Sequence, residues 1–302
     1  MPSLVSTLVR SQIGLISPIT KNMDLDQSRR LQDSLAKLGR GPLSAVVRFK
    51  QVDFPGFSCA WAIPLRGVVR CAALYLHGGA YTAGTLPYAK RFGGELARNT
   101  GRAIFCVGYR LAPENPFPAA LDDAVTAYRH MLTRFEPAEI AVIGESAGGG
   151  LTYALLQQLK AEGLPMPAYV VAISPWTDLT MQRENPEREA LDPLLDRAAL
   201  LESAMLYAAG NPLDDPLISP LFGDLDGMPP SLIFVGTDEI LYEDSVLLDE
   251  KLRAQGCEST LVVQEGMWHV YVFYGVPESK LAFSMIRSFL RCPDNACDVE
   301  TE

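Results

Sequence analysis

One short motif limits more than any other feature what this chain can fold into. Residues 140–151 read IAVIGESAGGGL, so the pattern Gly144-x-Ser146-x-Gly148 stands between an apolar, strand-like run and a helix-like run. A strand that turns this sharply into a helix holds the serine in a strained backbone conformation, and the two glycine positions come too close to the turn for side chains. The motif predicts a nucleophile elbow, with Ser146 at a helix N-terminus that favours developing negative charge. The same letters also describe an ordinary glycine-rich turn, so the prediction depends on the rest of the chain.

Length and composition set the class of protein. A length of 302 residues allows one large α/β domain with an insertion, and a hydrophobic content of 48% supports a sizeable core. The formal net charge of −10 is spread along the chain rather than gathered in a tail, and it argues against binding of nucleic acid or of an anionic membrane. The N-terminal residues show neither the pattern of a signal peptide nor that of a membrane span, so we expect a cytoplasmic protein.

The cysteines indicate neither a metal site nor a redox motif. The chain has six of them and no C-x-x-C pair, and we therefore expect no metal and no cofactor. We expect free thiols, as is usual in a reducing cytosol, with a pairing of Cys292 and Cys297 as the alternative.

Apolar runs and helical patterns alternate along most of the chain. Strands are predicted at 46–49, 57–63, 71–76, 103–109, 140–143, 169–174, 231–236 and 260–264, and helices at 24–37, 87–100, 117–135, 151–160, 243–255 and 279–291. This alternation predicts an α/β fold with a mostly parallel sheet between helices, and its reactive loops follow the carboxyl ends of the strands. Residues 176–227 lack strands and are interpreted as an insertion, with a helix at 196–209. The main domain then comprises residues 46–175 and 228–302, preceded by N-terminal helices in residues 1–45.

A serine nucleophile needs a base, and the chain offers only three histidines. His77 opens a glycine-rich loop, and His130 lies on a predicted helix where a surface position is expected. His269 follows the strand at 260–264 by a short loop, which places it at the carboxyl end of a strand. By elimination, we predict that His269 is the general base.

The histidine in turn needs a carboxylate, and the sequence offers two neighbouring candidates. Asp238 and Glu239 both follow the strand at 231–236, and Asp178 is a third candidate that lies one strand too early. Glu243 and Asp244 begin the next predicted helix and are expected to cap it. The residues alone leave the choice between Asp238 and Glu239 open.

Backbone N–H groups are predicted to bind the negative oxygen of a tetrahedral intermediate. One donor is the N–H of Ala147, directly after the serine, and others belong to the loop His77-Gly78-Gly79-Ala80. A glycine turn would explain this loop alone, but it explains poorly why the loop and the elbow follow successive strands.

Many motifs in a fixed order give the chain a resemblance to one family. They are His77 to Tyr81 (HGGAY), Tyr109 to Glu114 (YRLAPE), Phe117 to Ala120 (FPAA) with Asp122 and Asp123, Gly144 to Gly149 (GESAGG), Ser174 to Trp176 (SPW) with Asp178 to Thr180 (DLT), Pro216 to Leu221 (PLISPL), and Gly266-Met267 before His269. Over residues 70–291 the sequence resembles the hormone-sensitive-lipase branch of the α/β-hydrolases, the bacterial family IV esterases. The resemblance implies the α/β-hydrolase fold, a helical cap made from residues 1–45 and 176–227, and ester hydrolysis through an acyl-enzyme without a metal.

The sequence departs from the family pattern in three places. Ala80 replaces the third glycine of the family's HGGG motif, and Glu145 stands where the elbow usually has Asp. The acid motif of the family, D-x-L-x-D-E, corresponds here to residues 239–244, which read EILYED. This alignment puts Glu239 in the position of the catalytic acid, 30 residues before His269. We therefore predict Glu239 as the acid, with Asp238 as the alternative.

The sequence thus predicts a carboxylic ester hydrolase that acts on small-molecule, short- to medium-chain acyl esters. Ser146, His269 and Glu239 are its predicted triad, Gly79, Ala80 and Ala147 its oxyanion donors with Gly78 nearby, and Tyr81, Trp176, Met205 and Tyr207 its candidate pocket residues, for which core packing is an equal alternative. An amidase or formamidase would use the same machinery. A ligand receptor of this fold, like the plant gibberellin receptors, lacks the catalytic histidine that is present here. The resemblance also implies a homodimer through an edge strand of the sheet.

Overall fold

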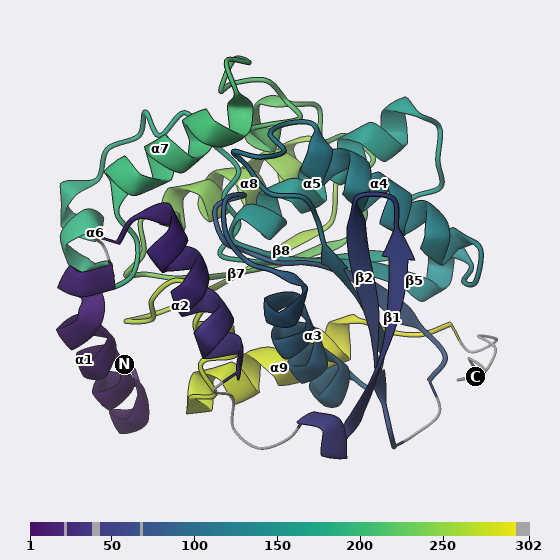
Figure 1. The fold of residues 1–302 in the computed structure, drawn as a ribbon, viewed down its shortest axis with the longest axis horizontal. Helices are drawn as coiled ribbons and strands as arrows, with labels where there is room; N and C mark the ends of the chain where they lie inside the picture. Colours follow the sequence, from purple (N-terminus) through teal and green to yellow (C-terminus); the bar gives the residue numbers. More distant parts are fainter. Residues whose placement is uncertain (21–22, 38–42, 67–68, 294–302) are drawn as a thin grey trace.

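A mixed sheet of eight strands organises the structure, a computed structural model in which residues 1–20, 23–37, 43–66 and 69–293 are described (Figure 1). The strands are β1 (Val47–Phe54), β2 (Phe57–Pro64), β3 (Ala72–Leu76), β4 (Ala103–Gly108), β5 (Ile140–Glu145), β6 (Tyr169–Ile173), β7 (Ser231–Gly236) and β8 (Ser259–Gln264). Their order is β1-β2-β4-β3-β5-β6-β7-β8. The pairs β1–β2 and β2–β4 are antiparallel, and the pairs from β4 through β8 are parallel. The predicted mostly parallel sheet is confirmed.

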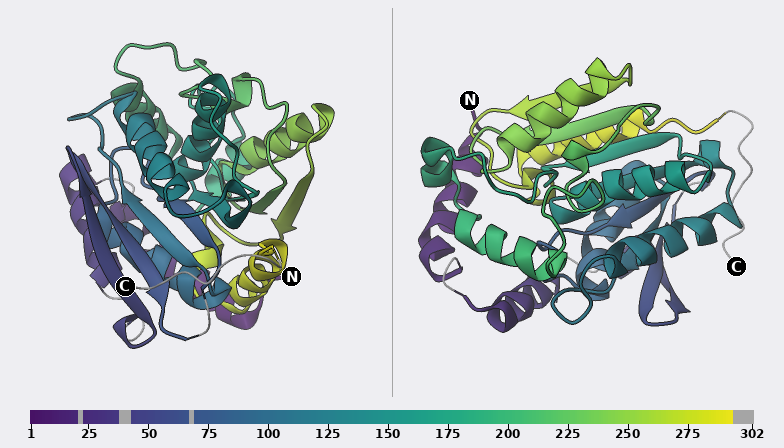
Figure 2. Two further views of the ribbon diagram at one scale, coloured as in Figure 1. Left: turned by 90° about the vertical axis from the view of Figure 1, so that its right-hand side faces the viewer. Right: turned by 90° about the horizontal axis from the view of Figure 1, so that it is seen from above.

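Helices cover both faces of the sheet (Figures 1 and 2). They are α1 (Leu4–Thr20), α2 (Leu25–Lys37), α3 (Leu86–Thr100), α4 (Ala119–Leu132), α5 (Ala147–Ala161), α6 (Pro186–Leu191), α7 (Arg197–Ala208), α8 (Tyr242–Ala254) and α9 (Pro277–Phe289). Neighbouring strand residues enter opposite cores: Leu74 packs with α4, α5 and α8, whereas Tyr75 packs with α3 and α9. This alternation is what a strand buried on both faces requires.

The segment between β6 and β7 contains α6, α7 and a short 3₁₀ helix, Pro220–Phe222, but no strand. The helices α1, α2, α6 and α7 gather on one side of the molecule (Figure 1). Contacts described below tie α1 and α2 to the loops that follow β3, β7 and β8. The insertion and the N-terminal helices therefore lie along the carboxyl edge of the parallel strands.

Element boundaries differ from the expected ones by a few residues. Asp24 caps α2, because its Oδ1 atom accepts a hydrogen bond of 2.8 Å from the N–H of Gln27, and the helix ends at Lys37 as predicted. The helix α4 begins at Ala119 rather than at Phe117, since Pro118 precedes it and is not helical. The hydrophobic pattern locates an element, but local backbone geometry decides where it starts.

Two expectations about side chains are wrong. His130 is half-buried rather than exposed: its ring stacks on Phe105 at 5.3 Å and meets Phe54 edge-on, because α4 presses this position against β1 and β4. Cys71 forms a disulfide with Cys292, with their Cα atoms 6.1 Å apart, although free thiols were expected for both. The approach of two cysteines 221 residues apart is a consequence of the fold that local sequence does not reveal. Cys297, the alternative partner, lies outside the described residues.

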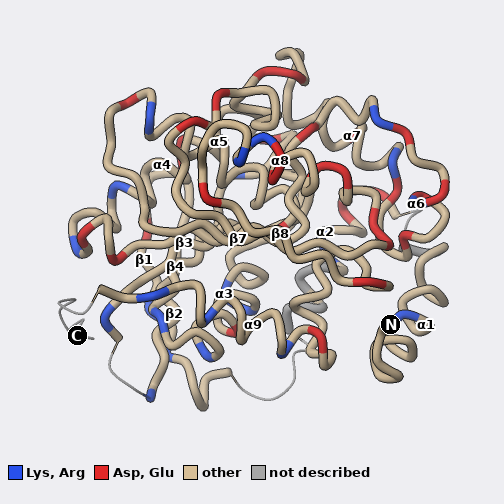
Figure 3. The backbone as a smooth tube through the Cα atoms, turned by 180° about the vertical axis from the view of Figure 1, so that it is seen from behind, with Lys and Arg blue, Asp and Glu red and all other residues tan. Residues whose placement is uncertain are grey.

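Charge is distributed unevenly over the fold. Residues 176–227 contain eleven Asp and Glu residues but only three Arg and no Lys. Figure 3 shows the acidic positions clustered around α6, α7, α8 and the neighbouring loops, whereas basic positions gather around β1, β2 and α3. The insertion is therefore an acidic part of the surface, although the acidic residues look evenly spread along the sequence. Among the described helices, none has the length and apolar character needed to cross a membrane.

Candidate active site

The elbow at Ser146 has the strained geometry that its sequence predicts. Ser146 joins β5 to α5 with φ 52° and ψ −123°, a backbone conformation that L-residues rarely adopt. A Cβ atom on Gly144 would lie 2.2 Å from the carbonyl oxygen of Gly148, and one on Gly148 would lie 2.1 Å from that of Leu76. Only glycine therefore fits on either side of the serine. The backbone of Ser146 is further fixed by hydrogen bonds of 2.9 Å to Ile173 and Trp176.

His269 and Glu239 form a buried pair near the elbow. Nδ1 of His269 lies 2.7 Å from Oε2 of Glu239, and the two residues are only 5% and 0% exposed. Burial alone would lower the pKa of His269, but the hydrogen bond and charge of Glu239, with help from Asp192 and Glu145, outweigh it and raise that pKa. The carboxylate therefore fixes the ring orientation and stabilises the imidazolium form.

Glu239 is itself held by two donors that the sequence did not indicate. Its Oε1 atom accepts hydrogen bonds from the N–H of Gly236 at 2.7 Å and from the hydroxyl of Ser174 at 2.8 Å. Ser174 follows β6 with a positive φ of 48°, and its oxygen also accepts the N–H of Val270 at 3.1 Å. Ser174 therefore joins the loop of the acid to the loop of the histidine. The SPW motif marked this residue, but nothing in the local sequence showed what it contacts.

The two other acid candidates point elsewhere. Asp238 pairs with Arg10 of α1 and accepts a hydrogen bond of 2.7 Å from the Thr237 hydroxyl. Asp178 forms an ion pair of 2.8 Å with Arg183. Among the three carboxylates considered, Glu239 is thus the one that contacts His269.

The loop after β3 offers free N–H groups beside the elbow. In the described part of the chain, no acceptor is recorded for the N–H of Gly79, Ala80 or Ala147. Gly79 and Ala80 have φ values of 121° and 52°, which turn successive N–H groups in an unusual direction. A Cβ atom on Gly78 would lie 3.0 Å from Cβ of Ser146, so this loop and the serine are in direct contact.

Gly78 differs from its neighbours because its N–H is already used. It donates to Oε1 of Glu145 at 3.1 Å, and the same oxygen accepts the hydroxyls of Tyr75 at 2.8 Å and Tyr88 at 3.1 Å. Burial raises the pKa of Glu145, while these three donors oppose the rise. Glu145, the departure from the family pattern, thus anchors the start of the loop. His77 is also structural here, since its ring stacks on Tyr109 with centroids 4.1 Å apart.

The candidate pocket residues divide into two groups. Tyr81, Trp176 and Tyr207 are at most 1% exposed, and the rings of Tyr81 and Tyr207 stack with centroids 3.8 Å apart. Met205, in contrast, is 62% exposed on α7. The rings of Tyr81, Trp176 and Tyr207 therefore pack the loop after β3 against the insertion.

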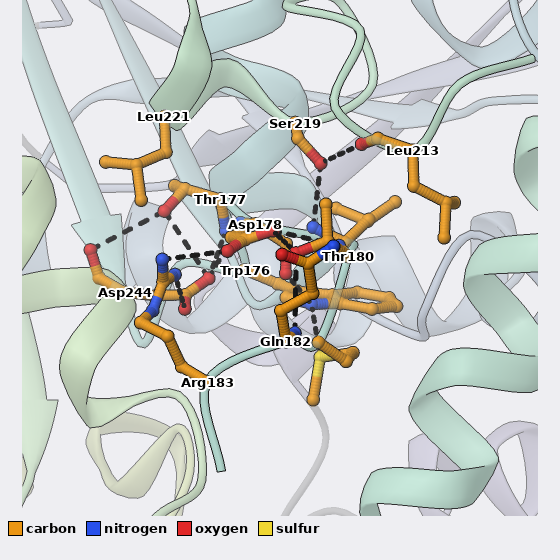
Figure 4. A network of polar contacts seen from close by, with 12 residues as sticks. Trp176, Thr177, Asp178, Thr180, Gln182, Arg183, Leu213, Ser219, Leu221 and Asp244 are labelled. Atoms are coloured by element: carbon orange, nitrogen blue, oxygen red, sulfur yellow. Dashed lines mark hydrogen bonds and ion pairs between the residues drawn. The ribbon is translucent and has the colours of Figure 1, made fainter.

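A polar network fixes the loop that leaves β6 (Figure 4). Oδ2 of Asp244 accepts the N–H groups of Thr177 at 2.7 Å and Asp178 at 2.8 Å, and Arg183 binds both carboxylates. Burial raises the pKa of Asp244 to about 6, against the opposing effect of Arg183. The expectation that Asp244 caps α8 is therefore wrong: the carboxylate binds a different loop across the carboxyl edge of the sheet.

No hydrogen bond between the hydroxyl of Ser146 and His269 is recorded in the described structure. Both side chains are nearly buried, at 8% and 5% exposure, and both follow parallel strands at the same edge of the sheet. Catalytic hydrogen bonds are often long before a substrate binds. The strained Ser146, the buried pair of His269 and Glu239, and the free N–H groups of the loop after β3 thus all follow strands at one edge of the sheet.

Comparison with known proteins assigns the family. A family model described as the alpha/beta hydrolase fold matches residues 73–273. The chain belongs to this family. It is 37% identical to an acetyl-hydrolase of Streptomyces hygroscopicus over 90% of this chain and 91% of that protein. A solved esterase of the bacterial hormone-sensitive lipase family shares 33% identity with a TM-score of 0.90, covering 96% of this chain and 99% of that one.

A further solved α/β-hydrolase is similar over nearly its whole length. The structure of EstE5 soaked with p-nitrophenyl butyrate has a TM-score of 0.89 and 35% identity, and it covers 96% of this chain and 98% of its own. The resemblance to the hormone-sensitive-lipase branch is therefore confirmed, and with it the predicted fold class.

Proposed function

We propose that this α/β-hydrolase hydrolyses short- to medium-chain acyl esters of small molecules through an acyl-enzyme on Ser146. Its similarity to an acetyl-hydrolase and to an esterase of the hormone-sensitive lipase family supports carboxylic ester hydrolysis. The observation that carries the proposed mechanism is the 2.7 Å contact between His269 and Glu239 at strand ends beside the elbow.

The proposed reaction has two halves. The Ser146 oxygen attacks the ester carbonyl while its proton passes to Nε2 of His269, and Glu239 stabilises the resulting imidazolium. The N–H groups of Gly79, Ala80 and Ala147 bind the oxyanion. When the intermediate collapses, His269 returns the proton to the leaving alcohol. Water then attacks the acyl-enzyme with His269 again as base, which releases the acid and restores the serine.

A hydrolysis assay with p-nitrophenyl butyrate tests this mechanism. Ser146→Ala should lower kcat by about 10⁴-fold or more, because only oxyanion binding and substrate binding then remain. EDTA should leave the wild-type rate unchanged, since no proposed step needs a metal. Full activity in Ser146→Ala would contradict the mechanism.

The amidase alternative is tested with a matched anilide of the same acyl group. An esterase should cleave the anilide far more slowly than the ester. The amine is a poor leaving group until its nitrogen is protonated, and an esterase site need not be arranged to protonate it. A comparable kcat/KM for both substrates would favour an amidase or formamidase. The receptor alternative is disfavoured by the presence of His269, and it would be supported only if no ester or amide were cleaved.

We propose that residues 1–45 and 176–227 form a cap that limits the length of the acyl chain. The low exposure of Ser146, 8%, and the helices gathered along this edge support the proposal (Figure 2). We expect kcat/KM to be highest from acetyl to about hexanoyl esters, since a closed pocket excludes longer chains. A steady rise up to palmitoyl esters, with activation at an oil–water interface, would contradict this expectation.

We further propose a homodimer through β8, one of the two edge strands of the sheet. An edge strand presents unpaired backbone groups, and Val263 on β8 is 42% exposed. Light scattering should give twice the mass of the chain, and Val263→Asp should shift it to the mass of the monomer. A monomeric wild type would contradict the proposal.

We propose a cytoplasmic location. In a reducing cytosol the Cys71–Cys292 disulfide would be open, because such bonds are rare there. Cell fractionation shows whether the protein is cytoplasmic, and a count of alkylatable thiols in the recovered protein shows whether the disulfide is open or closed.

A further inference from the structure

One arginine from each of the two N-terminal helices binds the loops of the proposed site. Arg10 of α1 pairs with the carboxylate of Asp238 and donates to the carbonyl oxygens of Gly266 at 3.3 Å and Leu191 at 2.8 Å. Asp238 directly precedes Glu239, and Gly266 lies three residues before His269. One guanidinium therefore bridges the acid loop, the histidine loop and the end of α6.

The loops that Arg10 bridges are also bound to each other. The N–H of Asp238 donates to the carbonyl of Met267 at 2.9 Å, and the N–H of Gly266 donates to the hydroxyl of Thr237 at 2.8 Å. That hydroxyl in turn donates to Asp238 at 2.7 Å. Arg10 thus acts on a coupled unit, so a displacement of Asp238 is passed to both catalytic loops.

Arg29 of α2 makes the corresponding contacts on the oxyanion side. Its Nε donates to the carbonyl of Thr82 at 2.7 Å and its Nη2 to that of Ala112 at 2.8 Å. Both terminal nitrogens also bind the carboxylate of Glu114 at 2.7 Å, which is the main cause of the raised pKa of Arg29. Thr82 closes the oxyanion loop, because its N–H donates to the carbonyl of Gly79 at 3.0 Å.

The chemistry of arginine suits this task. Its planar fork can bind two carbonyl oxygens and a carboxylate at once, and it stays charged at any relevant pH. The Glu114 carboxylate is mostly exposed, so the ion pair alone contributes little to stability. What distinguishes Arg29 is the pair of backbone carbonyls that it holds in place.

We propose that Arg10 and Arg29 are positioning residues of the site: Arg10 aligns the acid with the histidine, and Arg29 aligns the oxyanion loop with the serine. This inference rests on the proposed ester hydrolysis. It assigns the N-terminal helices a part in the chemistry in addition to covering the substrate.

The two arginines should give different kinetic signatures. Arg10→Gln should lower kcat about tenfold, since small displacements of catalytic groups carry penalties of this order or larger. It should also lower the pKa of His269, because the contact with Glu239 that raises it is loosened. This pKa is read from the acidic limb of the pH profile of kcat/KM. Arg29→Gln should lower kcat about tenfold through weaker oxyanion binding, with KM and the pH profile unchanged.

The direction of the pH shift in Arg10→Gln separates positioning from a simple charge effect, and Asp238→Asn is its companion variant. Through space, loss of the Arg10 charge would raise the pKa of His269, whereas loss of the Asp238 charge would lower it. If the pair acts by positioning, both variants move the acidic limb to lower pH. An acidic limb that moves to higher pH in Arg10→Gln would overturn the assignment for Arg10.

Arg30→Gln is the matched control, because Arg30 is exposed on the same helix as Arg29. All rates are divided by the concentration of active sites, titrated with an organophosphate, so that unfolded protein is not counted. Arg10→Lys and Arg29→Lys should recover part of the lost kcat, and they replace the Gln variants if those do not fold. Rates per active site equal to those of Arg30→Gln would overturn the proposal. A wild type without Ser146-dependent ester hydrolysis would instead overturn the proposed function.

Discussion

At the scale of single residues, the proposed site depends on how one carboxylate is shared. The two oxygens of Glu239 bind different partners: Oε2 contacts His269, and Oε1 accepts from Gly236 and Ser174. The extra methylene of Glu over Asp lets the side chain reach the histidine from a loop whose preceding residue, Asp238, faces α1. The carboxylate of Glu239 therefore binds the histidine, and that of the neighbouring Asp238 binds the N-terminal helix.

We predict that Glu239→Gln lowers kcat by about 10²- to 10⁴-fold, because the imidazole loses the charge that orients it. Asp238→Asn should cost about tenfold at most, since it disturbs only the position of the loop. The measurement is kcat for both variants, with thermal melts to exclude unfolding. If Asp238→Asn were inactive and Glu239→Gln close to wild type, the acid would be Asp238.

The sequence could predict Ser146, His269 and Glu239 as candidates because each follows a recognisable strand, and because the motif register and the spacing to His269 favour Glu239 over Asp238. It could not identify Ser174, whose contacts arise only because β6 and β7 are neighbours in the sheet. It also could not show that the N–H of Gly78 is already bound, since the Glu145 side chain that binds it comes from a different strand. Contacts between distant segments are what local patterns lack.

At the scale of elements, most strands and helices were predictable, because buried parallel strands are short continuous apolar runs and helices repeat apolar residues at a longer spacing. The loop after β6 was not, because its shape depends on Asp244 of α8, a residue 66 positions away from Asp178. The carboxylate replaces water as the acceptor for two loop N–H groups. A buried acid of this kind makes the stability of the loop depend on pH.

We predict that the contribution of Asp244 to the free energy of unfolding falls as pH rises from about 4 to about 6. Its pKa is about 6 in the folded chain, against 3.8 for an aspartate in water, so the folded state retains a proton that the unfolded state loses. This contribution is fully present below pH 3.8 and is lost as pH rises through 6.

The check is a comparison of melting temperatures with Asp244→Asn, which keeps an acceptor oxygen but cannot titrate. The wild type should lose stability relative to the variant between about pH 4 and about pH 6.5, the range that the two pKa values span. A difference in melting temperature that is constant with pH would contradict the assignment.

At the scale of the whole molecule, charge is separated between the two sides of the fold. The insertion follows β6, and Ser146 and His269 follow β5 and β8 at the same carboxyl edge of the sheet. Figure 3 shows acidic positions gathered around α6 and α7 of this insertion. A one-signed field near a binding site attracts or repels charged substrates and weakens as salt is added.

We predict discrimination against anionic esters. A hemisuccinate ester should have a kcat/KM about ten times lower than the neutral butyrate ester of the same alcohol, since electrostatic effects on association are commonly of at least this size. Raising the salt concentration should reduce the difference. Equal values at low salt for both substrates would show that the acidic insertion does not act on the substrate.

The position of β8 at the edge of the sheet has a consequence for heat tolerance. Ser146 follows β5 in the middle of the sheet, whereas His269 follows a strand with only one neighbour. Edge strands open locally at a smaller free energy than central strands. Wherever β8 is not paired with a second chain, warming should therefore separate His269 from Ser146 while the rest of the sheet is still folded. The working temperature of the enzyme would then be set by the detachment of one strand, well below the temperature at which the core melts.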